Sequence, residues 1–193
     1  SKAMCEQLIN SYLINKKKLH FGLSSIRAGN VIGGGDFSKY RIIPDIIKNS
    51  KSKIINLRNP NHIRPWQHVL DVCYGYLIIP IFHYKKKEKY SGPYNIGPNE
   101  KKYINVLSLT KKFLKIIGKI YKIRIKKNKF IESKLLLLNS QKIKKSLKWS
   151  PLYNFEKSIY MTAIWYKEYL KKKDIKNFTY SQIEKYFKIG RAH

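Results

Sequence analysis

Three consecutive glycines, Gly33 to Gly35, interrupt the chain directly after a segment that reads as extended, and they constrain the fold of its N-terminal part. The preceding residues 23–32 are predicted to form a buried strand. A glycine run allows positive φ angles and lets a ligand approach the main chain closely. A strand that opens into such a loop is typical of α/β sheets, which place ligands at the carboxyl ends of their strands. By itself the pattern fits a flexible loop after any strand equally well.

The rest of the sequence alternates between helical and extended patterns, which favours an α/β fold. Asp71 and Asn154 are predicted to begin helices, and Gly118 is predicted to end one. Residues 85–92 are predicted to form a charged loop. The predicted helices cover residues 2–15, 42–49, 71–83, 106–117, 140–147 and 154–173, and the predicted extended segments cover 23–32, 54–57, 66–70, 94–96 and 120–125.

The net charge of +30 suggests a nucleic-acid-binding protein. However, only six of the 41 basic residues are arginines, and arginine is the residue best suited to bidentate recognition of phosphates and base edges. The lysines are spread along the chain, and Lys, Ile, Asn and Tyr all have AT-rich codons. Nucleotide bias therefore explains the charge better, and a basic nucleic-acid-binding module stays open as the alternative from another class.

The two cysteines, Cys5 and Cys73, both lie in apolar helical patterns. We expect buried, reduced thiols in a cytoplasmic protein. No paired histidines accompany the cysteines, so no metal site is expected. No apolar run reaches the ~18 residues of a transmembrane helix, and no signal peptide opens the chain. The sequence thus predicts a protein without a membrane partner.

Four further motifs accompany the glycine run: SKA with Glu6, RNP at Arg58–Pro60, RPWQHVLD at Arg64–Asp71 and YNIG at Tyr94–Gly97. In this order they resemble the second half of the extended short-chain dehydrogenases/reductases. RAGNVIGGGD, RIIPD and RPWQHVL are more narrowly similar to the CDP-glucose 4,6-dehydratase branch of that family. The resemblance covers residues 1–187. It implies the C-terminal part of a Rossmann-type α/β fold with its smaller substrate-binding domain.

The resemblance also implies a domain division. Residues 1–36 would end the NAD-binding Rossmann domain, and residues 37–187 would form mainly the substrate-binding domain, with returning Rossmann elements. GGGD does not match the G-x-G-x-x-G dinucleotide fingerprint. We therefore expect a longer protein, in which the fingerprint, a catalytic Tyr and an Asp-Glu acid/base pair precede this chain. Residues 188–193 are predicted to be a non-native tail, with a native tail as the alternative.

The implied activity is the NAD-dependent dehydration of CDP-glucose to CDP-4-dehydro-6-deoxyglucose. In the resembled enzymes C4 of the glucosyl group is oxidised, water leaves across C5 and C6, and hydride returns to C6. A dTDP-glucose 4,6-dehydratase or a UDP-sugar epimerase is the alternative within the family. The family commonly dimerises through the first helix and its neighbour, which implies a homodimer or higher homo-oligomer. The isolated chain is expected to be inactive and to fold poorly.

Lys2 is the catalytic residue that the resemblance implies. In the family a Tyr lies four residues earlier, and the lysine lowers its pKa and hydrogen-bonds the nicotinamide ribose. The same resemblance implies that Ala28 and Gly29 pass near the nicotinamide of NAD. Taken alone, Lys2 would read as a surface lysine at the start of a helix.

A second set of residues is implied to bind the nucleotide sugar. Arg64 is the strongest phosphate candidate, because a guanidinium can donate two parallel hydrogen bonds to a diphosphate. Asn30 could donate to a phosphate or sugar oxygen, or cap the end of the strand. Trp66 and His68 are expected to be core residues. The remaining members of the set are Gly33, Gly34, Arg41, Ile43, Pro44, Arg58 and Asn95, and for Arg58 a surface loop role is equally open.

Overall fold

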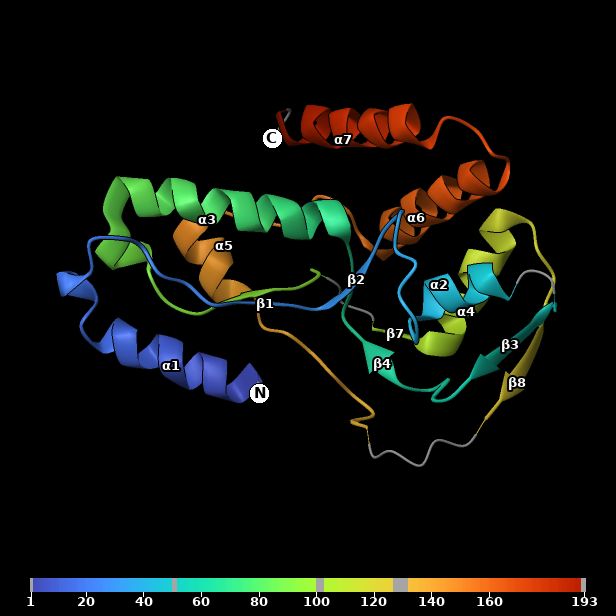
Figure 1. The fold of residues 1–193 in the computed structure, drawn as a ribbon, viewed down its shortest axis with the longest axis horizontal. Helices are drawn as coiled ribbons and strands as arrows, with labels where there is room; N and C mark the ends of the chain where they lie inside the picture. The colour runs from blue at the N-terminus through green and yellow to red at the C-terminus, as the bar shows by residue number, and fades with distance from the viewer. Residues whose placement is uncertain (1, 50–51, 100–102, 127–131, 192–193) are drawn as a thin grey trace.

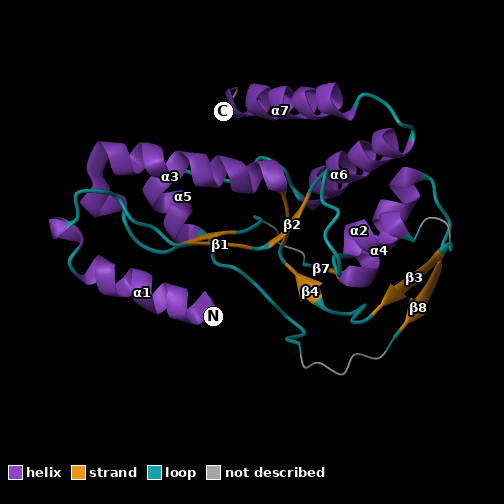
Figure 2. Cartoon of the chain, in the orientation of Figure 1, coloured by secondary structure: helices purple, strands orange, loops and turns teal. Residues whose placement is uncertain are grey.

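The computed structural model of the chain describes residues 2–49, 52–99, 103–126 and 132–191. Short strands pair two by two in this part of the chain, and helices surround them (Figures 1 and 2). The helices are α1 (Lys2–Ile14), α2 (Ile42–Lys48), α3 (Val69–Tyr90), α4 (Val106–Ile117), α5 (Gln141–Leu147), α6 (Phe155–Leu170) and α7 (Ile175–Arg191), with a 3-10 turn at Lys16–Lys18. The strands are β1 (Ile26–Ala28), β2 (Asn30–Ile32), β3 (Ile54–Leu57), β4 (Ile63–Arg64), β5 (Trp66–His68), β6 (Tyr94–Ile96), β7 (Ile104–Asn105) and β8 (Lys122–Ile125).

Three of the four strand pairs are parallel. β1 pairs with β6, β2 pairs with β5 and β3 pairs with β8, whereas β4 and β7 are antiparallel. Parallel pairing requires long crossover connections, which here contain helices. The predicted α/β fold is therefore confirmed.

Two main hydrophobic clusters lie on either side of the β2–β5 pair. One is centred on Trp149 and packs α3 and α5 against β1 and β6, with α1 on the opposite side of β1 (Figure 1). The other packs α2, α4 and α6 around β3, and Phe113 and Tyr166 are fully buried in it. The apolar residues of α4 recur at spacings of three and four, which explains why one face of this helix is buried. The predicted domain division between residues 36 and 37 stays a prediction.

Several helix ends follow the predicted local chemistry. The side chain of Asn154 accepts a hydrogen bond of 2.9 Å from the Lys157 N–H and so caps α6. Gly118 ends α4 in the left-handed conformation, with φ of 70°. Both predicted helix ends are confirmed.

The strand predicted over residues 23–32 is split into β1 and β2 at Gly29. The Gly29 N–H donates to the Ile96 carbonyl at 3.1 Å, and the next N–H, that of Asn30, donates to the Pro65 carbonyl at 3.0 Å. The chain thus changes partner from β6 to β5 within one residue. A Cβ atom on Gly29 would lie 2.5 Å from the Pro65 carbonyl oxygen, so this crossing requires glycine.

Two predictions about the C-terminal two thirds of the chain are wrong. Of the predicted loop 85–92, residues 85–90 are helical, because α3 continues to Tyr90 across a kink at Lys86, and only Ser91 and Gly92 lie outside the helix. α6 is not the final helix, because α7 follows it and carries half-buried Ile189 against a third cluster around Tyr186. The predicted tail is therefore helical up to Arg191, and residues 192–193 lie outside the described residues.

The cysteine prediction is also wrong, since both Cys5 and Cys73 are exposed and free. Cys5 lies on α1, a helix with no buried residue. Cys73 lies on the outward side of α3, next to exposed Tyr76 and Leu77. The apolar residues of α1 thus lie on exposed surface, whereas α3 buries one face, with Val72 and Ile79, and leaves the face of Cys73 exposed. Within the described ranges, none of the helices combines the length and apolar character that a membrane crossing needs.

The sequence predicted that Asp71 caps α3, and this prediction is wrong. His68 is the cap, and its Nδ1 accepts a hydrogen bond of 3.3 Å from the Leu70 N–H. Asp71 is fully buried, and its Oδ1 accepts from the Leu152 N–H and from the Tyr186 hydroxyl, both at 2.7 Å. Burial raises the pKa of the Asp71 carboxyl, while these hydrogen bonds oppose the shift. This carboxylate therefore joins the start of α3 to α7.

His68, expected to be a core residue, is indeed buried. Desolvation lowers the pKa of His68 to about 4 from 6.5. Below pH 6.5 the unfolded chain takes up a proton that the folded chain does not, so folding stability falls as the pH drops towards 4. The loss contributed by His68 is up to about 3 kcal/mol.

We expect His68→Asn to remove this part of the pH dependence while keeping a side-chain oxygen at the cap. Urea unfolding at pH 7 and pH 5 measures it: the loss of stability between the two values should be smaller in His68→Asn than in the unmodified chain. Exposed His20→Asn is the matched control and should keep the full loss. Equal losses in all three proteins would contradict the assignment.

Candidate functional site

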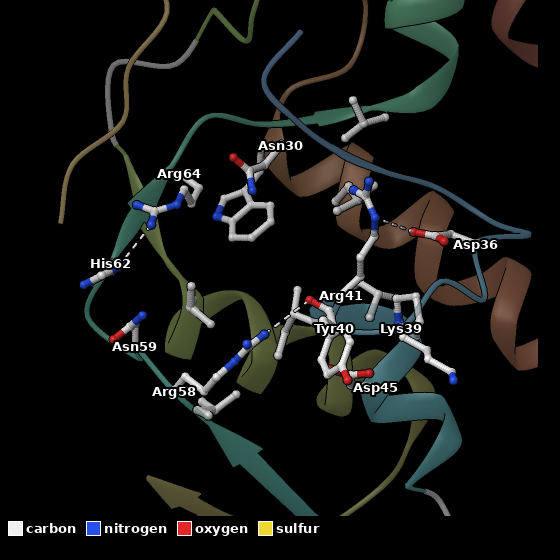
Figure 3. A pocket seen from close by; sticks show the side chains of 18 of the residues that line it. Asn30, Asp36, Lys39, Tyr40, Arg41, Asp45, Arg58, Asn59, His62 and Arg64 are labelled. Atoms are coloured by element: carbon white, nitrogen blue, oxygen red, sulfur yellow. Dashed lines mark hydrogen bonds and ion pairs between the residues drawn. The ribbon is translucent and has the colours of Figure 1, made fainter. Parts of the chain in front are cut away.

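A cavity of about 640 Å³ opens at the carboxyl end of β2, between the glycine run, α2 and the segment that joins β3 to β4 (Figure 3). Its floor is apolar and includes Ile43, Pro44 and Leu57, whereas polar and charged side chains surround its mouth. Of the residues predicted to bind the nucleotide sugar, the cavity is lined by Asn30, Gly33, Arg41, Ile43, Pro44, Arg58 and Arg64. Four separate segments that the sequence analysis singled out thus meet at one cavity.

Arg64 is the most constrained basic side chain of the cavity. Its side chain is only 8% exposed, and its Nη2 lies 2.7 Å from Oε1 of Glu132 and 3.0 Å from Nδ1 of His62. Its Nη1 donates to the Ile63 carbonyl at 2.8 Å. A buried guanidinium needs such partners, because an uncompensated charge in the interior is costly. These contacts fix the orientation of the fork that faces the cavity.

Glu132 completes this charge cluster from a distant part of the sequence. Its Oε2 accepts a hydrogen bond of 2.8 Å from the Asn59 amide. The hydrogen bond from Arg64 lowers the pKa of the Glu132 carboxyl, with Asn59 and the charge of Arg64 acting in the same direction. Glu132 is half exposed, so water or a ligand can reach this carboxylate.

The opposite side of the cavity carries a second group of charges. Arg58 Nη2 donates to the Tyr40 carbonyl at 3.4 Å, and Arg41 Nε lies 3.7 Å from Oδ2 of Asp36 (Figure 3). Desolvation raises the pKa of Asp45, and the positive charges of Arg58 and Lys48 oppose the shift. With Arg64 and Lys39, four basic side chains line the cavity. Three carboxylates, those of Asp36, Asp45 and Glu132, line it as well, so the remaining excess of positive charge is small and favours an anionic ligand.

The glycine run serves the packing of the protein itself. A Cβ atom on Gly33 would lie 2.4 Å from Cγ1 of Val69, and one on Gly34 would lie 2.1 Å from Cγ of Trp165. Gly35 has a φ of 80°. Gly34 is absent from the lining of the cavity, so its predicted contact with the substrate lacks geometric support.

Four other predicted site residues lie away from the cavity. Lys2 is exposed at the start of α1, and Ala28 and Gly29 lie at the end of β1. The Asn95 amide donates to the Asn139 carbonyl at 3.2 Å and accepts from Arg27 at 3.4 Å. The structure therefore does not bring the predicted cofactor residues and the predicted substrate residues into one cavity.

Sequence reasoning missed several residues that line the cavity, among them Tyr40, Asp45, His62 and Glu132. His62 could have been found from its place in the NHIRPW segment, two residues before Arg64. Nothing local points to Glu132, which lies 68 residues beyond Arg64. In the described part of the chain, no group of three or more His, Cys, Asp and Glu side chains could hold a metal ion.

Known proteins share part of this sequence and of this fold. No protein-family model matches the chain. The CDP-glucose 4,6-dehydratase of Salmonella typhimurium strain LT2 is 33% identical over 156 residues, which cover 80% of this chain and 44% of the relative. A dTDP-glucose 4,6-dehydratase from Bacillus anthracis, solved in complex with NAD, superimposes with a TM-score of 0.67 at 22% identity, covering 82% of this chain and 49% of that one.

A UDP-glucose 4-epimerase from Stenotrophomonas maltophila, solved with NAD and formylated UDP-arabinopyranose, has a TM-score of 0.73 at 14% identity, covering 89% of this chain and 54% of that one. The chain has the fold of the C-terminal part of an extended short-chain dehydrogenase/reductase. It spans about half the length of the relatives that it matches. The predicted family resemblance and fold are thus confirmed.

Trp165 fills the space that a side chain at position 34 would need. We expect Gly34→Ala to destabilise the fold by about 1–3 kcal/mol, because the added methyl group overlaps the indole ring. The midpoint of urea unfolding measures the change. Gly190→Ala, at an exposed residue of α7, is the matched control: its Cβ would meet only the tip of the Leu152 side chain, at 3.2 Å, so its effect should be much smaller than that of Gly34→Ala. Equal midpoints for Gly34→Ala and the unmodified chain would contradict the packing role.

Proposed function

We propose that the protein to which this chain belongs is an NAD-dependent nucleotide-sugar 4,6-dehydratase with CDP-glucose as its substrate. The observation that carries the proposal is the position of Arg64, a buried guanidinium that faces a basic cavity in the segment RPWQHVL. The 33% identity to a CDP-glucose 4,6-dehydratase supports the same substrate class. A dTDP-glucose 4,6-dehydratase or a UDP-sugar epimerase is the alternative within the family.

In this proposal the cavity holds the nucleotide sugar. Arg64 donates to the diphosphate, with its guanidinium oriented by Glu132 and His62. Arg41 and Arg58 add positive charge at the mouth, and the Asn30 amide donates to a phosphate or sugar oxygen. Ile43 and Pro44 supply apolar surface for the nucleotide base. The described residues therefore act by binding and orienting the substrate.

The cofactor would lie against another part of the chain. Lys2 is exposed at the start of α1, and Ala28 and Gly29 end β1, so these residues fit one wall of an NAD site. Bound NAD would supply a hydride acceptor for C4 of the sugar and return the hydride to C6. Lys2 would hold the nicotinamide ribose and stabilise a neighbouring phenolate. The inactivity of the isolated chain and a cytoplasmic location stay predictions.

Arg64→Lys tests the proposed diphosphate contact. A lysine cannot reproduce the bidentate fork, so CDP-glucose should bind at least about tenfold more weakly, which corresponds to about 1.4 kcal/mol. Isothermal titration calorimetry measures the affinity. Arg124→Lys, on exposed β8 outside the cavity, is the matched control and should bind as the unmodified protein does. Unchanged affinity in Arg64→Lys would contradict the proposal.

We also propose that the protein forms a homodimer through α1 and α3. Leu8 and Tyr12 of α1 are 61% and 53% exposed, and Leu77 and Ile81 of α3 are 60% and 56% exposed. Each pair is four residues apart and therefore lies on one face of its helix. Exposed apolar helix faces of this kind are typical of protein–protein interfaces.

The double variant Leu8→Glu/Leu77→Glu should shift the protein to a monomer, because it would place charges in the interface. Size-exclusion chromatography with light scattering measures the mass. Ile120→Glu, at a residue that is 94% exposed elsewhere, is the control and should keep the dimer. A monomeric unmodified protein would exclude the proposed interface.

A further inference from the structure

One wall of the cavity combines an aromatic ring, a guanidinium and a carboxyl group. The Arg58 guanidinium carbon lies 5.8 Å from the centre of the Tyr40 ring. Asp45 lies beside both side chains and also lines the cavity (Figure 3). Tyr40 precedes α2 and Asp45 lies in the first turn of that helix, whereas Arg58 follows β3. The fold therefore assembles this group from two separate segments.

Tyr40 is held in a conformation that local energetics disfavour. Its φ is 64°, in the left-handed region, which costs a bulky residue roughly 1–2 kcal/mol. Hydrogen bonds hold the Tyr40 backbone in place, because its carbonyl accepts from Arg58 and its N–H donates to the Asp45 carboxyl. Its ring is left 78% exposed at the mouth of the cavity, where a ligand can reach it.

The chemistry of the three side chains selects a particular kind of ring. An aromatic ring and a guanidinium plane both stack on planar bases. Ile43, Pro44 and Leu57 add buried apolar surface beside them. A carboxylate accepts a hydrogen bond from an exocyclic amine, such as N4 of cytosine, but repels the carbonyl oxygen that uracil and thymine carry at the same position.

We infer that Tyr40, Arg58 and Asp45 form a nucleobase subsite that selects cytosine. This inference rests on the proposed function, since it assigns the base preference to the same cavity. Tyr40 stacks on the base, Arg58 donates to its O2 and N3 side, and Asp45 accepts from the 4-amino group. The preference for cytosine over uracil and thymine then arises at this wall, whereas the diphosphate is bound separately by Arg64.

Isothermal titration calorimetry with the full-length protein tests the inference. The probes are CDP, UDP, dTDP, ADP and inorganic pyrophosphate. The unmodified protein should bind CDP at least about tenfold more tightly than UDP or dTDP. Asp45→Asn should bring the ratio of CDP to UDP affinity close to one, because an amide can donate to the uracil carbonyl. Asp45→Asn preserves the shape of the side chain, and pyrophosphate affinity should stay unchanged.

Tyr40→Gly gives a second, independent readout. Glycine relieves the left-handed strain, so the urea midpoint should rise while CDP binding weakens about five- to 150-fold through the loss of stacking. Lys148→Gly is the matched control: Lys148 has φ of 55° at the end of α5, outside the cavity. It should raise the midpoint and leave CDP binding unchanged.

The outcomes separate the two levels of the proposal. Equal affinities for CDP and UDP, tighter binding of ADP than of CDP, or an unchanged ratio in Asp45→Asn would overturn the cytosine subsite and leave the nucleotide-sugar function standing. If Tyr40→Gly bound CDP as tightly as the unmodified protein does, the proposed stacking of the base on Tyr40 would be wrong. An unmodified protein that binds pyrophosphate but no nucleotide, or none of these probes, would overturn the proposed function together with the subsite.

Discussion

The parallel pairing of β2 with β5 is the contact on which the candidate site depends. It sets Asn30 opposite Trp66 and so brings the strand before the glycine run beside the RPWQH segment. The chain reaches this pairing by leaving β6 at Gly29, where only a glycine leaves room for the Pro65 carbonyl. Because β2 and β5 also lie between the two main clusters, the same few hydrogen bonds position the cavity and join the two halves of the core.

The ion pair between Arg64 and Glu132 is the second contact on which the cavity depends. Arg64 is too deeply buried to stand without a partner, and Glu132, His62 and Ile63 provide one. The carboxylate that satisfies it remains half exposed, so the guanidinium is oriented without being sealed from the cavity. The Arg64 guanidinium is therefore preorganised for an anion, because its orientation is already fixed before a ligand binds.

Sequence reasoning predicted what local chemistry determines. Asn154 and Gly118 mark helix ends because capping depends on a few adjacent atoms. The order of the motifs also anticipated that Asn30, Arg41, Arg58 and Arg64 share a cavity. The partners that arise from tertiary packing were not predictable: Glu132 meets Arg64 across 68 residues, and Asp71 meets Tyr186 instead of capping its helix. The exposed cysteines show that an apolar helical pattern cannot distinguish core from uncovered surface.

The hydrogen bond between Asp71 and Tyr186 spans 115 residues. During synthesis on the ribosome, the segment that forms α3 leaves the exit tunnel long before the segment that forms α7. The Asp71 carboxyl also accepts from the Leu152 N–H, but it lacks the Tyr186 hydroxyl until α7 has been made, and burying a carboxylate with unmet hydrogen bonds is costly. Completion of the start of α3, and of the strand that precedes it, thus depends on a segment that is made 115 residues later.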